Sequence, residues 1–250
     1  MTRLGTIGWI ERTGGWLAWQ ERLALVAQSV RARAAAAMRK RSGRKIRLLE
    51  VDAILPPDSS ITREAIALSQ DLSKPFLFNH CVRSYFWAHL LDEDTRPFDD
   101  EAVFTARMLH DLGLTEHGRR AAELGHCFTQ VGAHKACELA RKRGWSDRRA
   151  ELAANAITLH LNVLVADRHG KEAKMVRAGS GADVAGLGLH VLQRDQVDEV
   201  VSRIPRLNLK KEMLATLADE SRARPHSRIA FLCHQLHFGT MIERSAVFSE

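Results

Sequence analysis

The chain has 250 residues, of which 45% are hydrophobic and 27% charged, and its formal net charge is +7; this composition is typical of a soluble protein with one large domain or two small ones. The longest stretch without a charged residue covers residues 152–166, and because a membrane-spanning helix needs about 20 apolar residues, we expect no membrane span. The four cysteines have no CxxC spacing, which argues against a thiolate zinc site and favours a reduced, cytoplasmic protein; they are Cys81, Cys127, Cys137 and Cys233.

The positive charge is concentrated at the N-terminus. Residues 1–47 contain eleven basic and two acidic residues, a net charge of +9, whereas residues 48–250 contain 26 basic and 28 acidic ones. We predict an N-terminal arm over residues 1–48, containing Trp9, Trp16 and Trp19, and a main domain over residues 49–250. Residues 1–47 could bind nucleic acid or an anionic surface, or could be an organelle transit peptide. The plainer alternative is a solvated amphipathic helix whose tryptophans pack on the main domain.

The main domain is predicted to be helical throughout. Pro56 and Pro57 end the arm, and Asp58, Ser59 or Ser60 could cap the next helix. Beyond them, apolar residues recur at helical spacing, and no stretch alternates as a strand would. Helices are predicted over 62–72, 76–91, 99–112, 130–143, 147–160, 182–193, 196–202, 208–221 and 226–244. The fold class is therefore predicted to be an all-α bundle.

Polar residues interrupt the apolar faces of these helices at intervals of about one helix and one connection. They are His80, His110 with Asp111, His134, His160 and Asp183. Their positions alternate between the start and the end of successive predicted helices. Since short connections favour antiparallel packing of consecutive helices, we expect these side chains to gather at one end of the bundle.

Four of these residues are the predicted ligands of one divalent metal ion: His80, His110, Asp111 and Asp183. Adjacent helical residues point about 100° apart, so His110 and Asp111 can share an ion best at a helix end, where Gly113 releases the chain. A mixed nitrogen and oxygen donor set suits Fe, Zn, Mn or Mg and does not select among them. Such an ion lowers the pKa of a coordinated water molecule toward ~7. We therefore predict that a metal-bound water attacks a small substrate.

Four sequence segments resemble a known superfamily. "FNHCVRSYFWAHLL", "ARMLHDLGLTE", "AITLHLN" and "GADVAG", in that order, are similar to the HD-domain metal-dependent hydrolases, whose signature is a His, a His-Asp pair and a distal Asp on separate helices. "ILPPDSS…FLFNHCVRSY" looks closest to the cyanamide hydratase-like branch. The resemblance covers roughly residues 50–245. It implies an HD-type helical bundle with the same four ligands, and a substrate that is a phosphate ester or a nitrile-like compound.

Two further residues, Asp167 and His160, are considered for roles at or near the metal. Asp167 is an alternative to Asp183, but it lies in the charged segment "ADRHGKE", which is typical of a loop. His160 is predicted to be a catalytic or substrate-contacting residue, or simply to pack. Together with His134 it could hold a second metal ion, although Lys135 beside His134 indicates a solvated turn.

Further residues are assigned roles around the metal. Glu116 is a candidate general acid or base. Arg83, three residues after His80 on the same helix face, could orient a carboxylate of the site or bind an anionic substrate. Asn79 could form a hydrogen bond to a metal ligand. The competing function is a non-catalytic HD-like binding module whose basic arm binds nucleic acid.

Overall fold

The computed structural model describes residues 3–42, 49–121 and 127–248, and within these residues every regular element is helical. The predicted all-α fold is confirmed. Four 3₁₀ turns accompany thirteen α-helices in the described parts of the chain: α1 (Ile7–Thr13), α2 (Trp19–Ser42), α3 (Ser60–Leu72), α4 (Pro75–Leu90), α5 (Asp100–Leu109), α6 (Glu116–Ala121), α7 (Phe128–Lys142), α8 (Asp147–Leu159), α9 (Gly170–Ala185), α10 (Arg194–Arg203), α11 (Leu209–Ala223), α12 (Arg228–Gln235) and α13 (Phe238–Glu243).

Side chains at the ends of these helices explain where they begin. Ser59 caps α3, and Thr62 bonds back to it in a capping box. Asp99 accepts a hydrogen bond from the backbone N–H of Ala102 at the start of α5. Such caps satisfy backbone groups that the first helical turn leaves unpaired. The helix predicted over 226–244 is wrong in one respect: it is divided into α12 and α13, because His237 adopts a left-handed conformation with φ of 57°.

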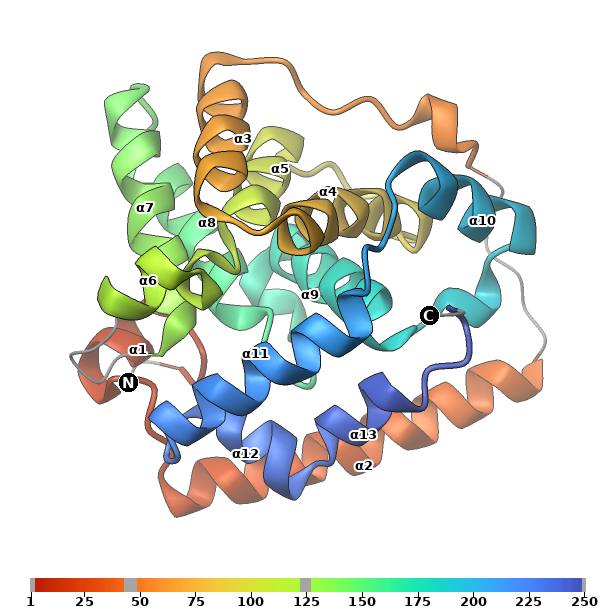
Figure 1. Cartoon of the computed structure of the whole chain (residues 1–250). Helices are drawn as coiled ribbons and strands as arrows, with labels where there is room; N and C mark the ends of the chain where they lie inside the picture. Colours follow the sequence, from red (N-terminus) through yellow and green to blue (C-terminus); the bar gives the residue numbers. More distant parts are fainter. Residues whose placement is uncertain (1–2, 43–48, 122–126, 249–250) are drawn as a thin grey trace.

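The helices form two connected cores. The larger core lies among α3, α4, α5, α7, α8 and α9, which occupy the upper part of Figure 1. The smaller core joins α11, α12 and α13 to this bundle, and Leu25 of α2 belongs to it. In Figure 1, α2 runs along the bottom of the molecule beside α12 and α13. The C-terminal helices and α2 therefore cover one side of the main bundle.

Helix α9 differs from the predicted helix over 182–193, which is wrong. It runs from Gly170 to Ala185 and ends at Gly186, whose φ of 69° is left-handed. The glycines before Asp183 resemble helix breakers in the sequence. However, a Cβ at Gly179 would lie only 2.1 Å from the carbonyl oxygen of Ser84 in α4. The glycine permits close packing of α4 and α9, and Asp183 lies in the last turn of α9 instead of the first turn of a later helix.

The first part of the arm, before α2, also packs on the main bundle. Trp9 is fully buried, its Nε1 donates to Glu21 at 2.6 Å, and the N–H of Ile7 donates to Asn155 of α8 at 2.9 Å. Trp16 is 57% exposed, but its ring contacts that of His226 in the main domain, with centroids 5.2 Å apart. Trp19 is 67% exposed. Packing of the tryptophans on the main domain thus holds fully for Trp9 and in part for Trp16, and the division of the chain at residue 48 stays a prediction.

None of the helices in the described segments combines the length and the apolar character that crossing a lipid bilayer requires. Binding of nucleic acid or an anionic surface by residues 1–47 stays a prediction, as does the cytoplasmic location. Residues 43–48, which hold part of the basic charge, lie outside the described residues.

Candidate metal centre

The His-Asp pair lies at the end of a helix, as predicted. Helix α5 ends at Leu109, and His110 and Asp111 follow before the 3₁₀ turn Leu112–Leu114. Both side chains are buried, His110 completely. The turn depends on Gly113, since a Cβ there would lie 2.0 Å from the carbonyl oxygen of Phe128. The backbone therefore leaves the helical path immediately after Asp111, which lets two adjacent side chains point to one place.

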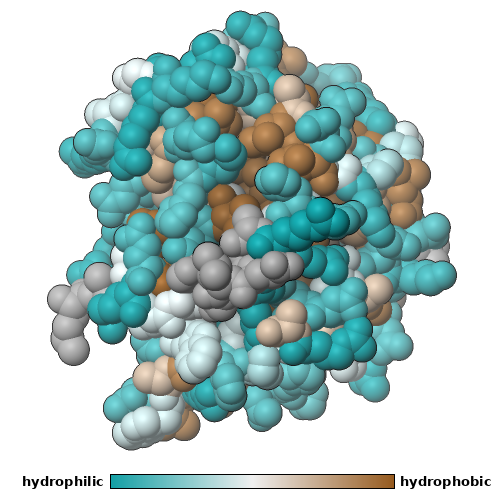
Figure 2. Space-filling model, turned by 60° about the vertical axis from the view of Figure 1, so that its left-hand side comes forward, coloured by the Kyte–Doolittle hydropathy of each residue, from teal (hydrophilic) through white to brown (hydrophobic). Residues whose placement is uncertain are grey.

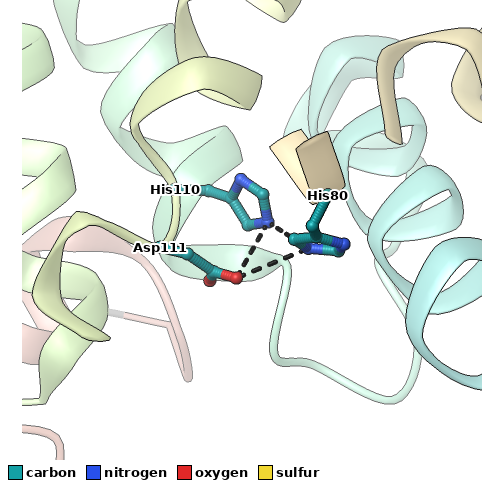
Figure 3. Close-up of side chains that lie close together, drawn as sticks. All are labelled: His80, His110 and Asp111. Carbon is teal, nitrogen blue, oxygen red and sulfur yellow. Dashed lines mark hydrogen bonds and ion pairs between the residues drawn. The ribbon is translucent and has the colours of Figure 1, made fainter. Parts of the chain in front are cut away.

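Three side chains from α4 and the end of α5 converge in the interior, and Figure 3 shows them pointing toward one another. Nε2 of His80 lies 3.1 Å from Nε2 of His110. Oδ2 of Asp111 lies 3.4 Å from each of these nitrogens. Donor atoms bound at about 2.0–2.2 Å to one metal ion lie roughly 3.0–3.5 Å from each other. The triangle of His80, His110 and Asp111, called here the metal triad, fits this requirement.

The hydrogen bonds of both imidazoles direct a lone pair into the triangle. Nδ1 of His110 lies 2.7 Å from the carbonyl oxygen of Arg107, which only accepts, so Nδ1 carries the proton. Burial lowers the pKa of His110 well below its usual value, so this ring is neutral. Nδ1 of His80 donates to Asp183 at 2.7 Å. Nε2 of His110 is then available to a cation, and Nε2 of His80 is available when that ring is neutral.

The charges around the metal triad are those of a cation site. Burial would raise the pKa of Asp111, but His110 and His80 beside it hold that pKa well below its usual range. Burial likewise lowers the pKa of His80, but hydrogen bonds to Asp111 and Asp183 outweigh it and raise that pKa. Buried carboxylates of this kind need a positive partner. A divalent ion among the three donor atoms would supply it.

Asp183, the fourth predicted ligand, lies next to His80 but outside the metal triad. Its oxygens accept hydrogen bonds from Nδ1 of His80, from Nε and Nη2 of Arg83, and from Nε1 of Trp87, at 2.7–2.9 Å. It therefore contacts the ring edge of His80 opposite to the triad. Its role as a metal ligand stays a prediction, and the observed contacts fit a residue that orients His80. Asp167, the rejected competitor, is on an exposed turn.

Arg83 and Asn79 lie on the same side of His80. The guanidinium of Arg83 is fully buried and also donates to the carbonyl oxygens of Ile204 and Pro205. It does not line the pocket beside the metal triad. Of the two roles predicted for Arg83, orientation of a carboxylate matches these contacts, whereas contact with a substrate does not. Asn79 donates to the same Pro205 carbonyl at 2.8 Å, and its described hydrogen bonds include none to a member of the triad.

His160 lies beside the metal triad. Its Nε2 is 3.7 Å from Oδ1 of Asp111, and its ring meets that of His110 edge to face. Nδ1 donates to the carbonyl oxygen of Ile157 at 2.6 Å, and burial lowers the pKa of His160 to about 4. His160 and the triad line one pocket of about 500 Å³. A neutral imidazole at this position can accept a proton or a hydrogen bond there.

The structure does not bring Glu116 or His134 to the metal triad. Glu116 is exposed and pairs with Arg120 within α6. His134 of α7 is exposed and lies 3.5 Å from Glu11, so the contacts offer no second metal site of His134 with His160. Helices α6 and α7 belong to the left-hand side of Figure 1, which Figure 2 turns forward and where hydrophilic residues cover most of the surface. The distance of Glu116 and His134 from the ligands along the sequence does not show whether their side chains face the interior.

Some residues at the site have no role assigned from the sequence. Trp87, inside the segment "FNHCVRSYFWAHLL", and Arg206, outside the quoted motifs, both contact Asp183. Small residues of α2 form part of the pocket wall: Ser29, Ala32, Ala35 and Ala36. Ser29, Ala32 and Ala36 follow the spacing i, i+3, i+7, which places them on one helix face. This pattern was available in the sequence, but it does not say what that face covers.

The comparisons with known proteins agree with this geometry. The family model described as HD domain matches residues 77–219, more than half of the chain, and this range includes the metal triad, His160 and Asp183. A search of curated proteins finds no match. Given this match, the chain belongs to the HD domain family.

Proposed function

We propose that this protein is a metal-dependent hydrolase that acts on a small molecule, with a phosphate ester as the leading substrate class. The observation that carries the proposal is the triangle of donor atoms formed by His80, His110 and Asp111. Proteins of the HD domain family are usually metal-dependent phosphohydrolases. The proposed cofactor is one divalent ion, and the donor set of two imidazoles and a carboxylate suits Fe, Zn, Mn or Mg.

Each residue of the site has a separate role in this proposal. His80, His110 and Asp111 would hold the divalent ion, and the chemistry that it would supply is a lower pKa for water and polarisation of a substrate oxygen. His160, uncharged at neutral pH, faces the same pocket and accepts a proton or a hydrogen bond through Nε2. Asp183 fixes the tautomer and the orientation of His80, and Arg83 holds Asp183 in place.

Hydration of a nitrile-like compound is the alternative reaction. It rests on the resemblance of "ILPPDSS…FLFNHCVRSY" to the cyanamide hydratase-like branch. Both reactions need an activated water molecule, so the metal triad serves either. A pocket of about 500 Å³ is much larger than a compound of three heavy atoms needs, and this favours a bigger substrate.

The test begins with the metal content of the purified full-length protein, after chelation and reloading with each of the four metals. We expect one equivalent per chain in the wild type and a loss of stoichiometric metal in His110→Ala. His134→Ala is the matched control, because His134 is exposed and lies away from the triad; it should keep its metal. A full equivalent retained by His110→Ala would refute the proposed site.

The same preparations are then assayed with phosphomonoesters, nucleotides and cyanamide. Turnover of a phosphomonoester or nucleotide that is lost in His110→Ala supports a phosphohydrolase, and turnover of cyanamide alone supports the hydratase. Substoichiometric, chelator-insensitive metal without any turnover would favour the non-catalytic binding module.

A further inference from the structure

The pocket that contains the metal triad has largely apolar walls. Its volume of about 500 Å³ lies within the ~300–1,000 Å³ usual for small-molecule sites. The C-terminal helices contribute a continuous apolar part of the lining: Met213, Leu217, Ile229, Leu232, Leu236 and Phe238. A nucleoside or sugar would leave many polar groups without partners on such a surface. The walls instead fit an apolar body.

One charged side chain in this wall lacks a partner. Arg177 of α9 is half-buried and lines the pocket, yet the contacts of the described residues include no hydrogen bond, ion pair or ring stacking for it. Burial lowers the pKa of Arg177, and no neighbouring carboxylate offsets this effect. The guanidinium stays charged nonetheless, since its pKa is so high.

The other arginines of the interior are engaged. Arg83 pairs with Asp183, Arg107 donates to Ser180 at 2.6 Å, and Arg228 donates to Asn162 at 2.7 Å. Arg39 of α2, which also lines the pocket, pairs with Glu93. Removing a cation from water without a partner is costly. Among these arginines, Arg177 is thus the one without a protein partner for its charge in the described residues, so its guanidinium is available to bind a ligand.

Arg177 also lies further back along α9 than Asp183, the residue of this helix that contacts the triad. It precedes Asp183 by six residues on α9, which corresponds to about 9 Å along the helix axis. Asp183 contacts His80 directly. An anion at Arg177 therefore occupies a different place from the group that reacts at the triad, and apolar wall lies around both.

We propose that Arg177 binds an anionic group of the substrate, and that this substrate is an amphipathic small molecule whose apolar body fills the pocket while its reactive group reaches the metal triad. The proposal rests on the proposed function for the identity of the reacting end. A carboxylate or a phosphate can form two parallel hydrogen bonds with a guanidinium, so either anion satisfies Arg177.

The test compares two ten-carbon ligands that differ in the head group, decanoate with a charged carboxylate and decan-1-ol with a neutral hydroxyl, in calorimetric titrations of the metal-loaded protein below micelle-forming concentrations. We expect the wild type to bind decanoate at least tenfold more tightly than decan-1-ol. Arg177→Gln should weaken decanoate binding by roughly 10- to 100-fold, as expected for a charge-assisted hydrogen bond, and leave decan-1-ol unchanged. Arg168→Gln removes the same charge from an exposed position on α9's preceding turn and should behave like the wild type.

Further outcomes separate this proposal from the previous one. If Arg177→Gln binds decanoate as tightly as the wild type, or if the wild type does not distinguish the two ligands, the proposal is overturned. Selectivity that disappears in His110→Ala but persists in Arg177→Gln also overturns it, because the carboxylate then binds at the metal. A wild type that carries no metal but shows Arg177-dependent selectivity refutes the hydrolase while supporting the anion site. Arg177→Gln should keep a full equivalent of metal, which shows that the variant is folded.

Discussion

Nδ1 of His80 donates a hydrogen bond to Oδ2 of Asp183 at 2.7 Å, while Nε2 of the same ring faces His110. The carboxylate therefore fixes which nitrogen carries the proton and which one can bind a metal ion. Asp183→Asn removes its negative charge and the partner of Arg83. We expect metal affinity to fall by about 10- to 100-fold, as is usual when the residue behind a ligating histidine is changed, with full stoichiometry at saturating metal. A competitive metal titration measures this.

Ser84→Ala is the control for this experiment. The hydroxyl of Ser84 lies 3.4 Å from the same Nδ1, so its removal takes away a longer neutral contact and leaves Asp183 in place; we expect little change in affinity. If Asp183→Asn binds no metal at any concentration, Asp183 is a direct ligand, as the sequence predicts. Unchanged affinity would mean that it has no part in metal binding.

A second prediction concerns the backbone contact that supports the His-Asp pair. Gly132 of α7 lies against the carbonyl oxygen of Leu109, the residue before His110, and a Cβ there would be 2.0 Å from that oxygen. In an open helix, replacing Gly with Ala stabilises by about 1 kcal/mol. Here we expect the opposite, a loss of about 1–3 kcal/mol in the free energy of unfolding, together with weaker metal binding, since α7 must move away from the pair. Urea unfolding of the metal-free protein and a metal titration measure the two effects.

Gly239→Ala supplies the comparison. Gly239 lies in α13, and a Cβ there would meet only Leu214 at 3.7 Å, an ordinary contact. This variant should be as stable as the wild type or more stable. Equal behaviour of the two variants would show that the approach of α7 to Leu109 does not constrain the site.

The sequence predicted much of the site because its signals are local. The apolar periodicity indicates the helices, and His110 with Asp111 at the end of one of them follows from the angle between adjacent residues and from Gly113. The start of the helix that contains Asp183 could not be predicted, because a glycine such as Gly179 usually indicates a helix end. Its role in the close packing of α9 against Ser84 is visible only in the structure. Tertiary contacts, not local propensity, decide whether a glycine interrupts a helix.

The sequence also does not show how deeply each side chain is buried. Glu116 and Arg83 are both charged residues close to a predicted ligand, yet the first is exposed and the second fully buried. Nor does the sequence reveal that α2 forms part of the pocket wall or that Arg177 faces the pocket. Both depend on how distant helices pack, which helical periodicity does not determine.

The third prediction is a pH dependence. Asp99 caps α5 and pairs with Arg149 through Oδ1 and Nη2 at 2.8 Å. Burial opposes its charge, but the bonds from Arg149 and the N–H of Ala102 outweigh burial and lower the pKa of Asp99 from its usual 3.8. A carboxyl group whose pKa is lower in the folded state stabilises the fold above its unfolded pKa. This contribution is lost as the pH falls through the folded pKa.

Asp99→Asn keeps a capping side chain but removes the charge. At neutral pH we expect a loss of about 1–2 kcal/mol in the free energy of unfolding, and this difference from the wild type should shrink below about pH 4. Asp198→Asn is the control, since Asp198 forms an exposed pair with Arg194 in α10; it should change stability by less than about 0.5 kcal/mol. A difference for Asp99→Asn that does not change with pH would assign its effect to the cap and not to the ion pair.

The last prediction tests how firmly the N-terminal arm belongs to the fold. Trp9 and Trp19 are the same residue type ten positions apart, but Trp9 is fully buried and Trp19 is 67% exposed. Trp9→Ala should lower the free energy of unfolding by about 3–5 kcal/mol, because it leaves a cavity in the smaller core and removes the donor to Glu21. Trp19→Ala should cost less than about 1 kcal/mol, since an exposed side chain loses little burial. Urea unfolding followed by circular dichroism measures both. Two small and equal losses would show that the burial of Trp9 does not anchor the residues before α2 to the bundle.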